Sequence, residues 1–162
     1  MSTNKSELKE WRFHVFWSAD ETDSSADEAS QLREALLEEI KRDKNFVVVC
    51  DGVTKALVPG LKARPPPANY RSITRDSCSS LVVWVPQESL GHAVAWFTLH
   101  RGSLSILIHP LTRFERRDHT IHAMWLGPPV ELDMEKLRMD LKSTPRQFPE
   151  LGLGYSKKIQ WV

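Results

Sequence analysis

Cysteine is scarce in this sequence, since Cys50 and Cys78 are the only two among 162 residues. Two thiols are too few for a disulfide framework, so we expect both to be reduced in a cytoplasmic protein. An excess of charge of one sign is also missing, because 22 Lys and Arg nearly balance 21 Asp and Glu. Together with the lack of any basic block, this balance argues against a nucleic-acid partner.

Long apolar runs are missing as well. The N-terminal segment MSTNKSELKEW is polar, which predicts neither a signal peptide nor a membrane span. The composition is nevertheless 41% hydrophobic, which is enough for one core in a chain of this length. We therefore predict a single domain over residues 1–162, with 1–10 and 143–162 flexible or peripheral.

Hydrophobic periodicity predicts strands that alternate with helices. The expected strands cover 12–17, 45–50, 80–86 and 103–110, and the expected helices cover 24–43 and 88–102. Ser25 and Glu28 have the spacing of a capping box, and Gly102 is placed to end the second helix. An edge strand within 119–127 and a last helix over 134–141, N-capped by Asp133, complete the predicted elements.

The order β-α-β-β-α-β predicts a ferredoxin-like α+β domain with a C-terminal extension. In that topology the strands 12–17, 80–86 and 103–110 are neighbours in the sheet. Alternation along the first strand places Arg12, His14 and Phe16 on one face. We therefore expect His14, Trp84 and His109 to meet on one face of the sheet.

Two histidines stand out in the stretch LSILIHPLTRFERRDHT, residues 104–120. His109 ends an apolar strand before Pro110, where an imidazole can bind a metal or simply satisfy a backbone carbonyl. His119 follows Asp118, so a carboxylate could lock its ring in the way that outer partners hold metal ligands. His92, His100 and His122 are interpreted as solvated or packing residues.

The segment LHRGSLSILIHPLTRFERRDHTIHAMWLG, residues 99–127, resembles the DOPA 4,5-dioxygenase family. The corresponding region of that family has an Asn-Arg-Gly turn, a strand ending in His-Pro, an Asp-His-Thr and a Trp-Leu-Gly. The resemblance extends from about 11 to 137 and is strong over 90–127. It implies a ferredoxin-like fold and opening of a catechol ring next to its diol, with ferrous iron and dioxygen.

The sequence departs from the family pattern at two places. The family's first strand carries His-x-His, where this chain has Arg12 and His14, and the family's Gly-Pro-His-Pro corresponds to residues 74–77. Asp76 then stands where the family has a histidine. Iron in oxygenases is commonly held by two imidazoles and a carboxylate. The resemblance therefore implies Fe(II) ligands His14, His109 and Asp76, with His119 at the rim or in an outer shell.

Arg12 weighs against a retained metal, because a guanidinium repels a dication and cannot ligate it. It can instead form an ion pair with Asp76, which would leave a metal-free pocket. We assign His109, His119 and Arg12 to catalysis, and Arg75, Arg117 and Trp84 to binding a small aromatic substrate. For Trp84 the alternative is a core position.

Three kinds of function remain open at this point. The first is extradiol cleavage of a catechol such as DOPA or of a related secondary metabolite. The second is a cofactor-free cyclase, isomerase or decarboxylase, and the third is a non-catalytic binding protein. A homodimer is expected from the family and from exposed sheet edges. The proline-rich loop 51–79, whose basic residues include Lys62, Arg64, Arg71 and Arg75, is expected to cover the pocket mouth.

Overall fold

The computed structural model describes residues 8–18, 22, 24–43, 46, 48–49, 73–74 and 78–158. Its centre is a five-stranded antiparallel sheet in the order β2-β3-β1-β4-β5. The strands are β1 (Glu10–Ser18), β2 (Val48–Val49), β3 (Cys78–Pro86), β4 (Ser105–Pro110) and β5 (Met124–Leu126). The first four strands have the ferredoxin-like order, and the edge strand predicted within 119–127 is β5.

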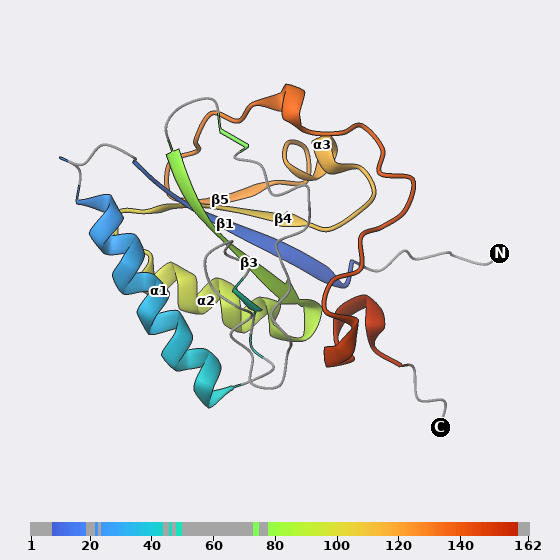
Figure 1. Ribbon diagram of the computed structural model, residues 1–162, viewed down its shortest axis with the longest axis horizontal. Coiled ribbons are helices and arrows are strands. Elements are labelled where there is room, and N and C mark those ends of the chain that lie inside the picture. Colours follow the sequence, from blue (N-terminus) through green and yellow to red (C-terminus); the bar gives the residue numbers. More distant parts are fainter. Residues whose placement is uncertain are drawn as a thin grey trace.

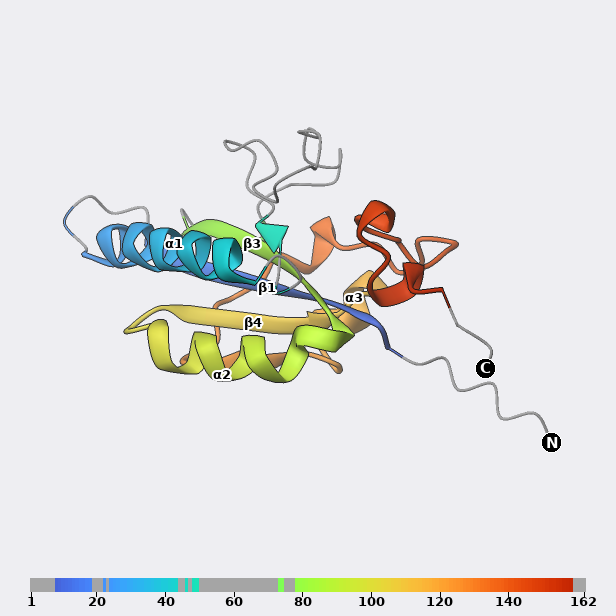
Figure 2. The ribbon, with the colours of Figure 1, turned by 90° about the horizontal axis from the view of Figure 1, so that it is seen from below.

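Two long helices cover one face of this sheet. They are α1 (Ser25–Arg42) and α2 (Leu90–His100), and they lie at the lower left of the strands in Figure 1. Figure 2 shows α2 running along β4. None of the helices that the structure describes has the length and apolar character needed to cross a bilayer.

The hydrophobic core lies between these helices and the sheet. Alternate residues of the central strands point into it, including Phe13, Val15, Val83, Ile106 and Ile108. From α1 the core receives residues spaced by three or four positions, as a helix with one apolar stripe requires: Ala29, Leu32, Leu36 and Ile40. Each large side chain buried in this way stabilises the fold by about 1.5–3 kcal/mol.

The predicted capping box at the start of α1 is wrong. Ser24 occupies the N-cap position without a side-chain bond, and the hydroxyl of Ser25 accepts a hydrogen bond from the backbone N–H of Ser18. The carboxylate of Glu28 instead accepts bonds from the backbone N–H and the hydroxyl of Ser103, each at 2.9 Å. Glu28 therefore ties α1 to the turn before β4, and this tertiary contact outweighs the local motif.

Gly102 ends α2 as the sequence predicts, and its conformation explains the choice of residue. Its φ of +56° lies in the left-handed region, and a Cβ there would come within 2.6 Å of Glu28 Oε2. Gly91, by contrast, has nothing within 4 Å of an added Cβ.

We expect Gly102→Ala to lower the free energy of unfolding by about 1–2 kcal/mol, since a side chain there adopts a strained backbone conformation. The matched control Gly91→Ala lies within α2 and should instead stabilise the protein by about 0.5–1 kcal/mol. Urea unfolding of both variants measures the difference. Equal stabilities for the two variants would contradict this account of the turn.

The last predicted helix, over 134–141, is also wrong. The structure has only a 3-10 helix at Met134–Lys136, where the carboxylate of Asp133 accepts a bond from the N–H of Glu135 as predicted for an N-cap. Beyond it, the N–H of Arg138 donates to the Glu115 carboxylate at 2.9 Å. Backbone donors that a longer helix would have used are taken by tertiary partners.

The other face of the sheet is covered by the segment that follows β4. This segment includes the short helix α3 (Glu115–Asp118), the orange chain at the upper right of Figure 1 and the red chain at its lower right. Phe148, Leu151 and Leu153 pack there against Trp84 and Leu111. The sheet is thus covered on both sides, and Glu10, His14 and His109 of its second face are buried.

Candidate metal site

Three histidines converge on the sheet face that lies away from α1 and α2. His14 comes from β1, His109 from the end of β4, and His119 from the residue after α3. In the β1–β4 pair, Arg12 lies opposite His109 and His14 opposite Leu107. Because alternate residues share a face, this register sets His14 and His109 diagonally side by side. Their Nε2 atoms are 3.1 Å apart.

His119 completes the cluster from outside the sheet. The single turn of α3 brings the chain back, and the backbone N–H of His119 donates to the carbonyl of Glu115 at 3.1 Å. Its ring centroid then lies 3.9 Å from that of His109 and 5.5 Å from that of His14. One nitrogen from each of the three rings lies within 4.8 Å of the others, which is a spacing that allows a shared metal ion.

Backbone carbonyls fix the orientation of two of these rings. His109 Nδ1 lies 2.7 Å from the carbonyl oxygen of Pro110, and His119 Nδ1 lies 2.8 Å from that of Glu115. A carbonyl oxygen only accepts, so both Nδ1 atoms carry hydrogen and donate. In a neutral imidazole the Nε2 lone pair is then left for a metal, as in most histidine metal ligands.

Burial keeps all three rings uncharged at neutral pH. The exposed fractions of His14, His109 and His119 are 5%, 1% and 5%. Burial is the largest cause that lowers the pKa of each ring, and that of His14 and His109 falls well below its usual value. The neighbouring rings and Arg12 lower the pKa of His14 and His109 further. For His119 the carbonyl of Glu115 partly opposes the shift.

These residues fit a divalent transition metal. Two nitrogens that bind one ion at about 2.1 Å and at a right angle are about 3.0 Å apart, which is close to the spacing of His14 and His109. Buried polar atoms need partners, and the Nε2 lone pairs of His109 and His119 both face the cluster. A hydrogen on His14 Nε2 can satisfy that of His109, whereas one bound ion would satisfy all three rings. Imidazole ligands suit iron, zinc, copper and nickel.

The arrangement of the described residues differs from the prediction at His119, and the predicted ligand role of Asp76 beside His14 and His109 stays a prediction. His14 and His109 lie together, but His119 belongs to the cluster itself, where the sequence had placed it at the rim or in an outer shell. His119 reaches the cluster because the single turn of α3 redirects the chain, and hydrophobic periodicity does not predict such a short turn. Asp76 and Arg75 lie outside the described residues, as does most of the loop 51–79.

Asp118 does not hold the ring of His119, contrary to the interpretation drawn from their adjacency. Its buried carboxylate accepts bonds from the backbone N–H and the hydroxyl of Thr112, each at 2.8 Å, and lies 3.1 Å from His122 Nδ1. Asp118 thus closes the loop between β4 and α3, and a backbone carbonyl orients His119 instead.

The remaining predicted site residues that the structure describes differ in burial. Arg12 is half-buried on the same face of β1. Trp84 is fully buried, packs on Phe148 and donates its indole N–H to Glu10, so its position is that of a core residue. Arg117 is exposed. Contact of Trp84 and Arg117 with a substrate stays a prediction.

Glu10 is a feature of this face that the sequence analysis missed. Its fully buried carboxylate accepts hydrogen bonds from Trp84 Nε1 at 3.1 Å and from the backbone N–H groups of Gln147 and Tyr155. Burial raises the pKa of Glu10, while these bonds and Arg12 oppose the rise. The alternation of residues along the first strand could have placed Glu10 on the same face as Arg12 and His14. Glu10 fastens the C-terminal segment over the sheet.

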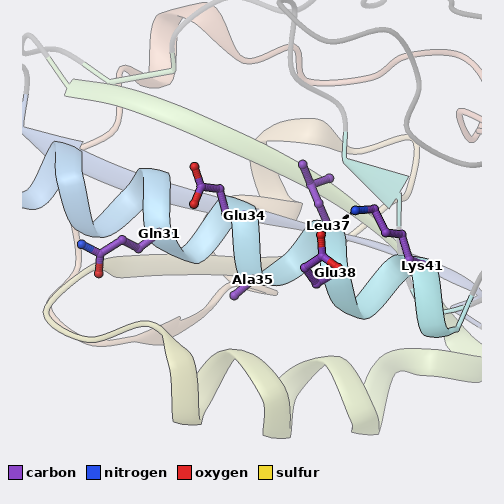
Figure 3. A pocket seen from close by; sticks show the side chains of 6 residues that line it. All are labelled: Gln31, Glu34, Ala35, Leu37, Glu38 and Lys41. Carbon is purple, nitrogen blue, oxygen red and sulfur yellow. Dashed lines mark hydrogen bonds and ion pairs between the residues drawn. The ribbon is translucent and has the colours of Figure 1, made fainter.

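A separate hollow runs along the solvent side of α1. Its lining combines the apolar Ala35 and Leu37 with polar side chains that include the Lys41–Glu38 ion pair, as Figure 3 shows. These side chains belong to the helix-covered side of the molecule, whereas the histidine cluster lies on the opposite face of the sheet. The hollow has the chemistry of a solvated helix surface and takes no part in the site.

Fold and site together define a ferredoxin-like domain with a candidate three-histidine metal centre. The chain belongs to the Dopa 4,5-dioxygenase family, whose sequence model matches residues 11–136. This membership confirms the resemblance seen in residues 99–127.

Two curated proteins are similar to this chain. The DOPA 4,5-dioxygenase of Amanita muscaria is 34% identical over 151 residues, which cover 93% of this chain and 59% of that protein. An uncharacterized 21.2 kDa protein of Botryotinia fuckeliana is 36% identical over 58 residues, or 32% of each chain. This chain therefore spans less than two thirds of the length of either relative.

A solved structure shares the fold. The crystal structure of a candidate dioxygenase from Nostoc punctiforme superimposes with a TM-score of 0.51, covering 80% of this chain and 90% of that one, at 23% identity. At this level of identity the likeness speaks for the α+β architecture alone, in agreement with the prediction from element order.

Proposed function

We propose that this protein is a metal-dependent dioxygenase that opens a catechol ring next to its diol, with Fe(II) held by His14, His109 and His119. The observation that carries the proposal is the convergence of three buried, uncharged imidazoles on one sheet face. Membership in the family supports the dioxygenase class. What we propose beyond the dioxygenase class is the catechol substrate, the Fe(II) ion and cleavage of the ring next to the diol.

The chain's own residues have distinct tasks in this proposal. The carbonyls of Pro110 and Glu115 hold the rings of His109 and His119 in one tautomer, so that Nε2 stays available as a ligand. The C-terminal segment fastened by Glu10 helps to keep water from the sheet face. Bound Fe(II) would supply Lewis-acid and one-electron chemistry to the catechol and dioxygen.

The test is iron content and oxygen incorporation. Protein purified without oxygen and supplied with Fe(II) should bind about one iron per chain, as expected for a single three-ligand site. With DOPA or a simpler catechol it should consume one dioxygen per ring opened, and the product made under ¹⁸O₂ should carry both labelled atoms. Iron-loaded protein that opens no catechol ring would refute the proposed reaction.

The His14–His109 geometry also favours a second candidate. An Nε2–Nε2 distance of 3.1 Å suits one proton shared between two imidazoles, which a metal-free cyclase, isomerase or decarboxylase can use as a relay. Such an enzyme would turn over its aromatic substrate in the presence of EDTA and consume no dioxygen. The same assay run with and without chelator therefore separates the two functions.

A further inference from the structure

Arg12 stands next to the histidine cluster by the register of the sheet. It lies directly opposite His109 in the β1–β4 pair and two residues before His14 on the same face of β1. Residues directly opposite in an antiparallel pair have Cβ atoms about 4.5–5.5 Å apart. A guanidinium on this stem is therefore a neighbour of the metal site that the structure places among the three rings.

The positive charge of Arg12 acts on every member of the cluster. Burial is the main cause of the lowered pKa of His14, His109 and His119, and Arg12 lowers each of them further. Glu10, two residues before Arg12 on the same face of β1, interacts with this charge and also accepts hydrogen bonds from Trp84, Gln147 and Tyr155. Glu10 thus faces Arg12 from the side away from the rings.

The charge of a loaded site follows from its ligands. Among the residues that the structure describes, the cluster contains three neutral imidazoles and no carboxylate. A divalent ion would keep its full charge there, beside a guanidinium that is never deprotonated. Each like charge in a partly dehydrated site raises the free energy of binding the other. An anion that contacts both the ion and Arg12 would remove this repulsion.

We propose that Arg12 makes metal binding and anionic-substrate binding mutually dependent at the His14–His109–His119 site. The metal binds weakly alone and more tightly with a chelating catecholate, whose negative charge lies between the ion and the guanidinium. The inference rests on the proposed metal site and deepens it, since it assigns Arg12 to specificity for anionic chelating substrates. By linkage, each ligand changes the affinity of the other by the same factor.

The experiment uses Zn²⁺ as a metal without oxygen chemistry and 4-nitrocatechol as a chromophoric catecholate. Binding of 4-nitrocatechol is followed by its absorbance in metal-free and Zn²⁺-loaded protein, and Zn²⁺ affinity is measured by calorimetry. We expect Zn²⁺ to tighten catecholate binding at least about tenfold, within the usual 5- to 150-fold range of coupling.

Arg12 variants identify the source of the coupling. Arg12→Met should bind Zn²⁺ alone at least about fivefold more tightly and lose most of the coupling, whereas Arg12→Lys keeps the charge and should keep much of it. Arg42→Met, which removes an exposed arginine from the last turn of α1 on the helix-covered side of the sheet, should behave like the unchanged protein. Arg12→Gln serves as the neutral variant if Arg12→Met does not fold, as judged by circular dichroism.

The outcomes separate this inference from the function on which it rests. If Zn²⁺ does not bind in the unchanged protein, the metal site is wrong and the inference falls with it. If Zn²⁺ binds stoichiometrically but the neutral Arg12 variants show the same coupling as the unchanged protein, only the role of Arg12 is overturned.

Discussion

The His119→Ala variant is expected to lose iron affinity and catechol turnover together, each by more than about a hundredfold. Removing an outer partner of a metal ligand already costs about 10- to 100-fold, and a direct ligand should cost more. The ring of His119 lies 3.9 Å from that of His109 and supplies the third nitrogen of the cluster. With it gone, two imidazoles remain.

His119 is a sharper test than His109 because its ring contributes less to the fold. His109 is 1% exposed within a strand of the sheet, so its loss would disturb packing as well as chemistry. The backbone of His119 keeps its own bond to the carbonyl of Glu115 whatever the side chain. The fold of His119→Ala should therefore survive, which near-UV circular dichroism can verify.

Elemental analysis and oxygen consumption on the same sample measure the two losses. The matched control is His92→Ala, which removes a half-exposed imidazole that packs on Phe46 on the helix side. It should retain iron and turnover. A His119→Ala protein that binds iron and turns over normally per folded molecule would return His119 to a structural role.

The sheet could be predicted from sequence because its signals are local. Alternation along β1 separates Phe13 and Val15, which enter the core, from Arg12 and His14, which face the other side. Once the βαββαβ order is recognised, the neighbours of β1 follow from topology, and His109 is brought to the same face. The pairing of His14 with His109 rests on these periodic features alone.

No periodic pattern in the sequence predicts the position of His119 or the packing of the C-terminal segment on the sheet. His119 reaches the cluster through one turn of α3 and a bond to a backbone carbonyl, and neither has a periodicity. Glu10 fastens residues 147–155 through backbone N–H groups, which any sequence offers equally. Trp84 is a similar case, since a buried indole and a substrate-stacking indole look the same until Phe148 is seen to pack on it.

The metal-free protein is expected to lose stability steeply as the pH falls below about 6.5. Burial lowers the pKa of His14, His109 and His119 in the folded state from the usual value of 6.5. In acid the unfolded chain therefore takes up protons at these rings before the folded protein does. Because the unfolded state binds more protons in this window, the free energy of unfolding decreases as the pH drops.

The slope can be bounded from the number of rings. One proton changes the free energy of unfolding by about 1.4 kcal/mol per pH unit, so three rings give at most about 4 kcal/mol per unit. Glu10 acts with the opposite sign, because burial raises its pKa and the folded protein takes up that proton first. Glu10 takes up its proton in the folded state at a pH above 4.5, the usual pKa of the unfolded chain. Near that pH its protonation partly offsets the decrease in the free energy of unfolding that the histidines cause.

Urea unfolding of chelator-treated protein between pH 7.5 and 5.0 measures this slope. His109→Leu removes one buried titrating ring and should reduce the slope by about a third, and His119→Gln should do the same with less disturbance of the strand. A stability that stays flat down to pH 5.0 would mean that the three rings accept protons in the folded state. The cluster would then be hydrated in the metal-free protein. Its imidazoles would be uncharged in this pH range only when a bound metal ion displaces their protons.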